Sequence, residues 1–288
     1  MDSAGTAREL RATLEAARNA DGGWGYVRGR GSRLEPTALA LLALHAAGAP
    51  RNTAVLEHWP ATGAFLRDPQ SGEINVTDNA QAALAAEVLG LDAVASRLVA
   101  GLVALKGMRL PPSDTTRQDN SLQGWPWVSG TFSWVEPTAW CVLAVKRWTR
   151  TRPGRDAAAR IEEAERLLMD RACATGGWNY GNSVVLGRAL PPYVPTTALA
   201  LLALRTRADQ PVVRRALRAL AERRLDERGA LALSLARIAL TAYGENAAGV
   251  DEALAEAWQR EAFLGNLMGT ALALSALAGG DRDHAFAS

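Results

Sequence analysis

Three carboxylates stand directly before Ala- and Leu-rich stretches, where they could perform acid–base chemistry. They are Glu35, Asp78 and Glu136. If the apolar stretches are parallel helices, the three side chains face the same end of the bundle. Carboxylates that lie close together can act as an acid and base pair or bind a cation. We therefore take Asp78, Glu136 and Glu35 as candidate catalytic residues.

The alternative is that these carboxylates only satisfy free amides at the starts of helices. Asp and Asn are preferred N-cap residues, so Asp78 and Asn79 could together cap the helix that follows them. The helix dipole would also favour the ionised form of Asp78. An ionised carboxylate cannot protonate an alkene, and under this hypothesis the carboxylates belong to the scaffold.

Aromatic residues are concentrated between positions 125 and 148, where five of the nine tryptophans lie. Trp24, Trp125 and Trp178 occupy equivalent turns, and we expect them to pack between adjacent helix pairs. Other aromatic side chains could line a pocket and present their ring faces to an apolar chain or a carbocation. These candidate ligand-binding residues are Trp127, Phe132, Trp134, Trp140, Tyr180 and Tyr193.

A repeated pattern organises these residues, and such repeats decide the fold. A turn containing Gly and Trp leads into a Pro-Thr or Thr-Thr pair and then into an apolar stretch. The tryptophan precedes the repeat threonine by 13 positions in the first two strong copies and by 19 in the third, so the third loop carries an insertion. Weaker copies cover 76–86, 231–242 and 265–276.

The repeat predicts helix pairs in which one member is buried and the other half-exposed. A stretch that is apolar on all sides is typical of a buried helix, and six such stretches alternate with six amphipathic segments. Six pairs can close into two concentric layers, so we predict an all-α (α/α)6 toroid forming one domain over 1–288. An open solenoid is the structural alternative. The amphipathic segments are 6–20, 52–66, 91–105, 154–173, 210–222 and 246–259.

The turn Asp21-Gly22-Gly23-Trp24-Gly25, followed by Glu35-Pro36-Thr37-Ala38, resembles the prenyltransferase and squalene oxidase repeat. The segment 124–140 is similar to a C-terminal segment of squalene cyclases. This resemblance implies the toroid shared by terpene cyclases and the β subunits of protein prenyltransferases. Fold alone does not imply their chemistry.

The chain departs from the terpene cyclase pattern at the position of the acid. The resemblance implies an Asp-x-Asp-Asp motif whose middle residue protonates an alkene or epoxide. The best match is Asn75-Val76-Thr77-Asp78, in which Thr77 stands at the acid position. Arg18 and Ala172 also stand where the repeat often carries Gln.

Three hypotheses of function follow, and the state of the central cavity separates them. The leading one is a terpene cyclase-like protein that binds an apolar isoprenoid ligand in a deep aromatic-walled cavity. If this protein is an enzyme, we expect an activity of the isomerase type with a non-standard acid. The second is a non-catalytic binding or assembly module, for which we expect a core plugged by side chains. The third is a carbohydrate-active toroid with paired carboxylates facing an open groove.

Composition argues against other classes of protein. The formal net charge is +2 and the arginines are interleaved with acidic residues, which does not favour nucleic-acid binding. The three histidines and Cys141 form no zinc-binding pattern, and phosphate-binding loops are absent, so we expect no metal and no cofactor. The longest apolar run, 38–49, is too short to span a bilayer. We expect a cytoplasmic protein that can touch a membrane peripherally, while the oligomeric state is not indicated.

Overall fold

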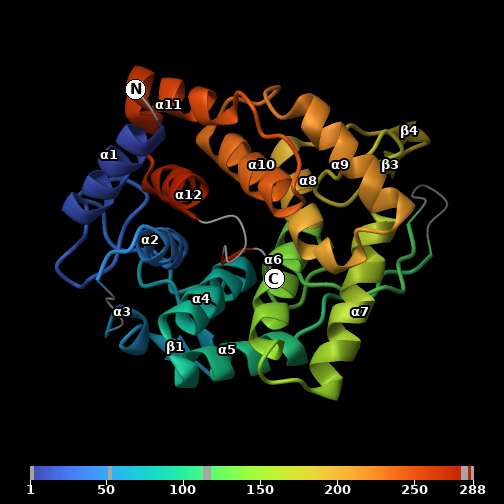
Figure 1. Cartoon of the computed structure of the whole chain (residues 1–288). Helices are drawn as coiled ribbons and strands as arrows, with labels where there is room; N and C mark the ends of the chain where they lie inside the picture. The colour runs from blue at the N-terminus through green and yellow to red at the C-terminus, as the bar shows by residue number, and fades with distance from the viewer. Residues whose placement is uncertain (1–2, 51–53, 113–117, 280–284, 287–288) are drawn as a thin grey trace.

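The computed structural model describes residues 3–50, 54–112, 118–279 and 285–286, and this part of the chain is mostly helical (Figure 1). The inner layer consists of α2 (Leu34–Ala46), α4 (Val76–Leu89), α6 (Val135–Thr149), α8 (Val194–Ala203), α10 (Ala230–Ala242) and α12 (Leu267–Ala278). The outer layer consists of α1 (Ser3–Ala16), α3 (Ala54–Glu57), α5 (Asp92–Ala104), α7 (Arg155–Asp170), α9 (Pro211–Arg223) and α11 (Val250–Glu261). Two hairpins, β1–β2 (Ala61–Thr62 with Phe65–Leu66) and β3–β4 (Val184–Val185 with Arg188–Ala189), and two 3₁₀ turns, η1 (Arg205–Arg207) and η2 (Ala262–Gly265), complete the described elements.

The inner helices form a closed ring. Each of them packs against the next in chain order, and α12 packs against α2. The outer helices surround this ring, as Figure 1 shows. Inner helices such as α2 and α12 are apolar on nearly all sides, whereas α7 and α9 bury only one face. The predicted (α/α)6 toroid is therefore confirmed, and the open solenoid is excluded.

Hydrogen bonds between loops show that the inner helices begin at the same end of the ring. The first amide of an inner helix donates to the loop that leads into the next inner helix. The bonds are Leu34 N to Asp68 Oδ2 (3.3 Å), Val76 N to Trp127 O (2.8 Å), Val135 N to Tyr180 O (2.9 Å), Val194 N to Glu227 Oε1 (2.8 Å) and, closing the ring, Leu267 N to Tyr26 O (2.8 Å). We call this end of the toroid, where the inner helices begin, the mouth.

The three repeat tryptophans each join an outer helix to the loop that follows it, as predicted. Trp24, Trp125 and Trp178 are fully buried. Their indole N–H groups donate to the carbonyls of Leu14, Leu102 and Leu168, near the ends of α1, α5 and α7, at 2.8, 2.8 and 2.6 Å. Their backbone amides donate to Oγ1 of the repeat threonines Thr37, Thr138 and Thr197, at 2.9 Å in each copy. The third copy keeps this bond because its extra residues form the β3–β4 hairpin.

One predicted outer helix is much shorter than expected. Within the predicted segment 52–66, only Ala54–Glu57 is helical in the described chain, and the β1–β2 hairpin follows. Pro60 interrupts the helical pattern, and Gly63 adopts a φ of 59° in the turn between the two strands. No helix of the described residues is long and apolar enough to cross a membrane.

Candidate functional site

Three rings of side chains line the axis of the toroid. In an α-helix, the second, sixth and ninth residues lie on one face. The second residues of the inner helices are Glu35, Thr77, Glu136, Pro195, Leu231 and Met268. The sixth residues are Leu39, Gln81, Trp140, Leu199, Leu235 and Leu272, and the ninth are Leu42, Leu84, Leu143, Leu202, Ile238 and Ser275.

A small cavity of about 60 Å³ lies at the mouth, within the first two rings. Its polar lining consists of Glu35, Gln81, Glu136, Tyr180 and Thr196. Its apolar lining consists of Leu39, Trp140, Pro195, Leu199, Leu231, Leu235, Met268 and Leu272. The structure thus brings two of the three predicted catalytic carboxylates to one cavity, while Asp78 is not among the lining residues.

Glu35 is fixed by hydrogen bonds at the edge of this cavity. The Tyr26 hydroxyl donates to its Oε2 at 2.6 Å, and the Gln81 amide donates to its Oε1 at 3.4 Å. Burial, followed by the charge of Glu35, raises the pKa of Tyr26, so its phenol stays protonated and remains a donor. These contacts orient the Glu35 carboxylate toward the mouth.

Glu136 also faces the cavity, but it lacks the hydrogen bonds that hold Glu35 among the described residues. No described side chain donates a hydrogen bond to its carboxylate. Burial, reinforced by repulsion from Glu35, raises the pKa of Glu136 to about 7. A carboxyl group with this pKa is protonated in a large fraction of molecules at neutral pH, so it can donate a proton.

Asp78 lies beside Glu35 rather than on the cavity wall. Burial, followed by repulsion from Glu35 and Asp68, raises the pKa of Asp78 to about 8. The expectation that the helix dipole keeps Asp78 ionised is therefore wrong, because desolvation outweighs the dipole. The expected cap is also wrong: Asn75 caps α4 by accepting from the amides of Thr77 and Asp78, at 2.8 and 3.2 Å.

Asn79 has a different role from the capping one considered in the sequence. Its side chain accepts from the amide of Leu66 at 2.8 Å and donates to the Leu66 carbonyl at 3.0 Å, and so ties the β1–β2 hairpin to α4. It is the fourth residue of α4, as the repeat threonines are in α2, α6 and α8. In this copy of the repeat, Asn79 therefore replaces the threonine as the inner-helix side chain that accepts a hydrogen bond from the preceding loop.

Two polar atoms near the mouth are buried without a hydrogen-bond partner among the described residues. They are the Thr77 hydroxyl and Oε1 of Gln81. Glu35, Thr77 and Glu136 are the second residues of three consecutive inner helices, α2, α4 and α6. The Thr77 hydroxyl therefore lies at the same level of the ring as the two carboxylates.

Five of the six predicted ligand-binding aromatics form a continuous series of ring contacts at the mouth, which we call the aromatic ladder. The contacts, with their centroid distances, are Phe132–Trp134 (4.8 Å), Trp134–Trp127 (5.2 Å), Trp127–Tyr180 (6.2 Å) and Tyr180–Tyr193 (5.5 Å). Tyr180 also lines the cavity that holds Glu136. The ladder thus leads from the outer surface to the carboxylates.

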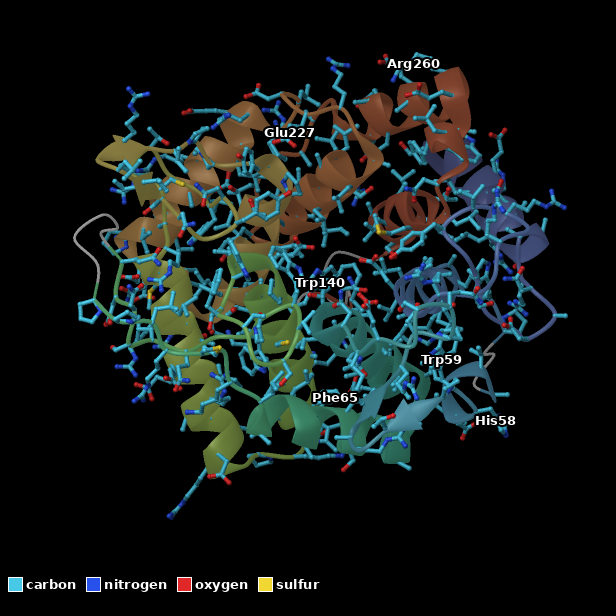
Figure 2. The ribbon with its side chains drawn as sticks, turned by 180° about the vertical axis from the view of Figure 1, so that it is seen from behind. His58, Trp59, Phe65, Trp140, Glu227 and Arg260 are labelled. Atoms are coloured by element: carbon cyan, nitrogen blue, oxygen red, sulfur yellow. The ribbon has the colours of Figure 1, made fainter. Side chains whose placement is uncertain are left out.

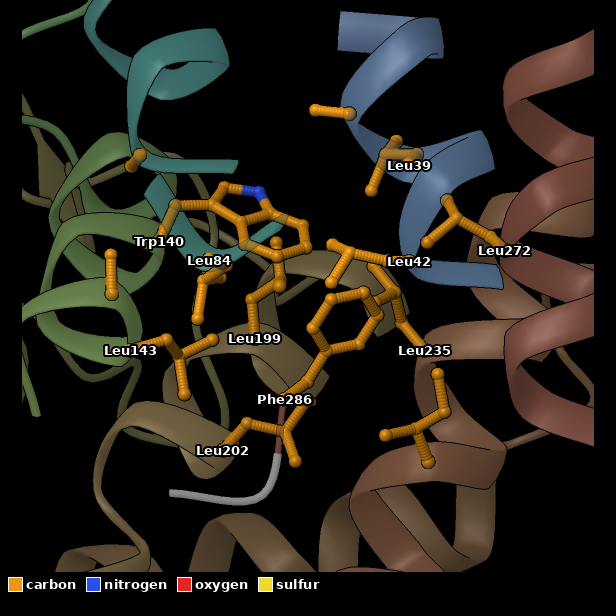
Figure 3. Packing of buried hydrophobic residues seen from close by; sticks show 14 of the residues in the cluster. Leu39, Leu42, Leu84, Trp140, Leu143, Leu199, Leu202, Leu235, Leu272 and Phe286 are labelled. Carbon is orange, nitrogen blue, oxygen red and sulfur yellow. The ribbon is translucent and has the colours of Figure 1, made fainter. Parts of the chain in front are cut away.

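Trp140, the sixth predicted aromatic, is buried on the axis of the toroid. Figure 2 shows it near the centre of the ring, whereas His58 and Arg260 lie at the outer edge. Its indole packs against the ring of Phe286, with centroids 5.2 Å apart and planes at 86°. Phe286 is fully buried, and it fills the centre among the leucines of the second and third rings (Figure 3).

Reasoning from the sequence missed the roles of Phe286 and Gln81. Gln81 could have been found by counting from the start of each apolar stretch, because the sixth positions share one face. Phe286 lies outside the repeat, and only its apolar, aromatic character distinguishes it from the charged residues at 281–284. Its burial means that the central cavity is filled in this structure.

An open groove of about 470 Å³ adjoins the outer end of the ladder. Phe132 and Trp134 line it together with polar residues such as Gln118, Asn120 and Arg171. Its described lining contains no carboxylate, and no group of His, Cys, Asp and Glu among the described residues could hold a metal ion.

Comparison with known proteins gives the class of fold. No protein-family model matches the chain, and no curated protein matches it in sequence. Among solved structures, an alpha-amylase from Clostridium perfringens superposes with a TM-score of 0.65 at 10% identity, covering 95% of this chain and 97% of that one. An alpha-1,6-mannanase of Salegentibacter gives 0.63 at 9% identity, covering 96% and 99%.

A type II terpene cyclase, MstE from Scytonema, gives a TM-score of 0.52 at 18% identity, covering 92% of this chain and 78% of the cyclase. At these identities the likeness is one of fold. The chain has the α/α toroid fold that this terpene cyclase and these glycosidases share.

The buried carboxyl groups predict a pH dependence of stability. The folded-state pKa of Glu136, about 7, lies above its ordinary value of 4.5. Its contribution is therefore complete below the unfolded-state pKa and is lost as the pH rises through about 7. Gln does not ionise, so the Glu136→Gln variant should not lose this contribution. Between pH 5 and pH 8, we expect its free energy of unfolding to fall by roughly 1–3 kcal/mol less than that of the wild type. Urea unfolding at the two pH values measures the difference.

Glu73→Gln, at an exposed loop position, is the matched control and should lose stability between pH 5 and pH 8 as the wild type does. An equal loss in Glu136→Gln would show that Glu136 is not held above its ordinary pKa.

Proposed function

We propose that the mouth cavity binds an apolar, isoprenoid-like molecule and that Glu136 protonates it, in a reaction of the terpene cyclase or isomerase class. The observation that carries this proposal is the position of Glu136: it is a carboxyl group with a pKa of about 7, set in an apolar, aromatic-walled cavity. Perturbed carboxyl groups in such cavities are candidates for general acids.

The surroundings of Glu136 suit a positively charged intermediate. Trp140 and Tyr180 line the same cavity, and their ring faces can stabilise a carbocation. Glu35, oriented by Tyr26 and Gln81, is placed to accept the proton that such an intermediate loses. In this scheme a proton leaves Glu136, forms a new bond on the substrate and another proton passes to Glu35, so the net reaction is an isomerisation.

The pKa of Glu136 limits which functional group of the substrate it can protonate. General acids work best when their pKa lies near the operating pH, because a stronger acid is already ionised and a weaker one drives the proton transfer less. A carboxyl group with a pKa of about 7 is a weak acid toward an alkene carbon. We therefore expect the acceptor to be an oxygen, as in the epoxide of an isoprenoid, whose ring opens on protonation without losing a leaving group, so that the net reaction remains an isomerisation.

The experiment that tests this function identifies the ligand. The protein is purified from a lipid-producing host, and apolar molecules are extracted and identified by mass spectrometry. We expect an isoprenoid from the wild type or from Phe286→Ala, whose cavity is larger, and none from Leu199→Trp, which fills the mouth cavity. Recovery of no apolar molecule from either of the first two proteins would contradict the proposal.

The filled centre supports a second candidate, a toroid that binds or assembles without catalysis. The architecture of the neighbouring glycosidases likewise leaves carbohydrate chemistry open, although only five of the thirteen residues lining the mouth cavity are polar. A non-catalytic module would retain its ligand chemically unchanged, and a carbohydrate-active toroid would cleave a glycan instead of binding an isoprenoid. Incubation of the protein with each class of molecule separates the three.

The surface around the mouth supports a peripheral membrane contact that would deliver such a ligand. The large apolar side chains that are exposed among the described residues all lie in loops leading into an inner helix or in its first turn. They are Val27, Met108, Leu110, Val128, Phe132, Tyr180, Leu186, Leu190, Tyr193, Leu231 and Leu264. Exposed arginines stand beside them at Arg28, Arg109 and Arg188, which favours an anionic lipid surface.

Leu186 and Leu264 are the most exposed of this set, at 75% and 80%, and both adopt positive φ. Because a non-glycine residue rarely adopts this conformation, the backbone holds them in solvent at a cost in stability. We expect Leu186→Glu with Leu264→Glu to lower binding to phosphatidylglycerol vesicles at least tenfold in a sedimentation assay. Ala208→Glu, exposed beyond the opposite ends of the inner helices, is the control. Equal binding by both variants would contradict the contact.

A further inference from the structure

Phe286 differs from the other side chains at the centre of the toroid, because it does not belong to an inner helix. It lies eight positions beyond the end of α12 and is still fully buried. Figure 3 shows its ring surrounded by leucines that the inner helices contribute, with Trp140 at one edge. The toroid thus encloses an aromatic ring that its own helices do not supply.

The residues around this ring also form the lower wall of the mouth cavity. Leu39, Trp140, Leu199, Leu235 and Leu272 line that cavity, and Figure 3 shows the same side chains around Phe286. Phe286 is not itself a lining residue, so its ring lies on the far side of this second-ring wall. The space that Phe286 would vacate therefore borders the mouth cavity across these second-ring side chains.

We infer that Phe286 is an intramolecular occupant of the central ligand site, and that an apolar group of similar size displaces it. This inference rests on the proposed function only in taking the mouth cavity as the entrance to the site. The lining is leucine and tryptophan, so the displacing group is uncharged and either aromatic or branched, as an isoprenyl unit is. A sugar would leave its hydroxyls without partners in the second and third rings, where Gln81 and Ser275 are the only polar residues among the described side chains.

Displacement is physically accessible because it breaks no helix. The cavity that remains is lined by apolar groups, and such a cavity stays dry and can accept benzene when its volume is on the order of 150 Å³. The mouth cavity alone, at about 60 Å³, cannot accept a ring of that size, so the ligand also needs the space that Phe286 fills. The apparent affinity of the wild type for a ligand is therefore lower than the affinity of the open site, in proportion to the fraction of molecules in which Phe286 has left the site.

The chain contains only four phenylalanines, which makes the exchange directly observable. The full-length protein is labelled with 4-fluorophenylalanine, and the four ¹⁹F resonances are assigned with single Phe→Leu variants. Toluene is then titrated as the probe. We expect the Phe286 resonance to move toward that of a solvated phenylalanine, and those of Phe65 and Phe263, which lie away from the axis, to stay in place.

The unlabelled Phe286→Ala variant provides the second measurement. We expect it to bind toluene at least tenfold more tightly than the wild type, with Phe65→Ala, in the β1–β2 hairpin away from the axis, as a control that should not gain affinity. A stationary Phe286 resonance while toluene binds would overturn the inference, as would equal affinities in a folded Phe286→Ala. If that variant does not fold, the resonance of the labelled wild type still decides.

This probe separates the two proposals. Toluene carries no group for Glu136 to protonate, so the exchange is measured without catalysis. If toluene displaces Phe286 but the protein neither retains nor converts an isoprenoid, the inferred site is supported and the proposed function is contradicted.

Discussion

Turnover of the apolar substrate is expected to fall by about 10²- to 10⁴-fold when Glu136 is replaced by Gln, the usual contribution of a positioned general acid. Gln preserves the shape of the side chain and removes the proton that it donates. The cavity and the aromatic ladder should remain, so substrate affinity should change little. Product formation at saturating substrate, measured by gas chromatography and mass spectrometry, gives the effect on the chemical step.

The pH profile of the wild type provides an independent check. The protonated form of Glu136 is the active one in this scheme, and its pKa is about 7. Activity should therefore be high below pH 7 and decline as the pH rises above it. Asp78→Asn is the matched control, because Asp78 is also a buried carboxyl with a raised pKa but does not line the cavity.

If Asp78→Asn abolishes activity and Glu136→Gln preserves it, the acid is Asp78 and the assignment to Glu136 is wrong. If both variants keep full turnover, neither carboxyl is the donor. Glu35→Gln tests the acceptor separately, since its loss should slow the final deprotonation and allow products trapped by water to accumulate.

The toroid itself could be predicted because several independent features of the sequence recur together and indicate the same helix-pair repeat. The tryptophan, the threonine and the apolar stretch recur together, and in the structure each strong copy makes the same two hydrogen bonds, Trp24 with Leu14 and Thr37 being one example. Parallel inner helices then required Glu35 and Glu136 to meet at one end. That prediction depended on register alone, and the mouth cavity confirms that the two side chains lie together.

The remaining features depend on contacts that local patterns do not encode. The pKa of Asp78 is set by burial and by Glu35, which lies 43 positions earlier in the chain, whereas the sequence showed only its place at a helix start. The shortened outer layer at α3 reflects a hairpin whose partner, Asn79, is on another element. Phe286 lies outside the repeat, so no periodicity could place it at the centre.

The largest expected effect on stability concerns Trp125. Its indole is fully buried, donates to the Leu102 carbonyl at 2.8 Å, and stacks with the guanidinium of Arg160 at 3.8 Å. Truncation of a buried tryptophan typically costs about 3–5 kcal/mol. We expect the stability loss in Trp125→Ala to reach at least the upper part of this range. The substitution leaves a cavity and also removes the stacking partner of the buried Arg160 guanidinium.

Trp125→Phe separates packing from hydrogen bonding, since it keeps most of the ring and leaves the Leu102 carbonyl with only the longer bond from the Leu105 amide, at 3.2 Å. Its expected cost is about 1–3 kcal/mol. Trp148→Ala is the control, because Trp148 is only partly buried and its contact with Arg152 lies on the outer surface. Urea unfolding followed by far-ultraviolet circular dichroism gives the three values, and equal losses in Trp125→Ala and Trp148→Ala would contradict the role of the repeat tryptophan.

The consequence for function follows from the loop that Trp125 anchors. This loop carries Trp127, Phe132 and Trp134, and the Trp127 carbonyl accepts the first amide of α4. Loosening the anchor should therefore displace the aromatic ladder before the inner helices separate. In partial denaturant, Trp125→Phe should lose affinity for the apolar ligand at urea concentrations where its helical content is still intact. Simultaneous loss of both signals would show that the ladder and the ring unfold as one unit.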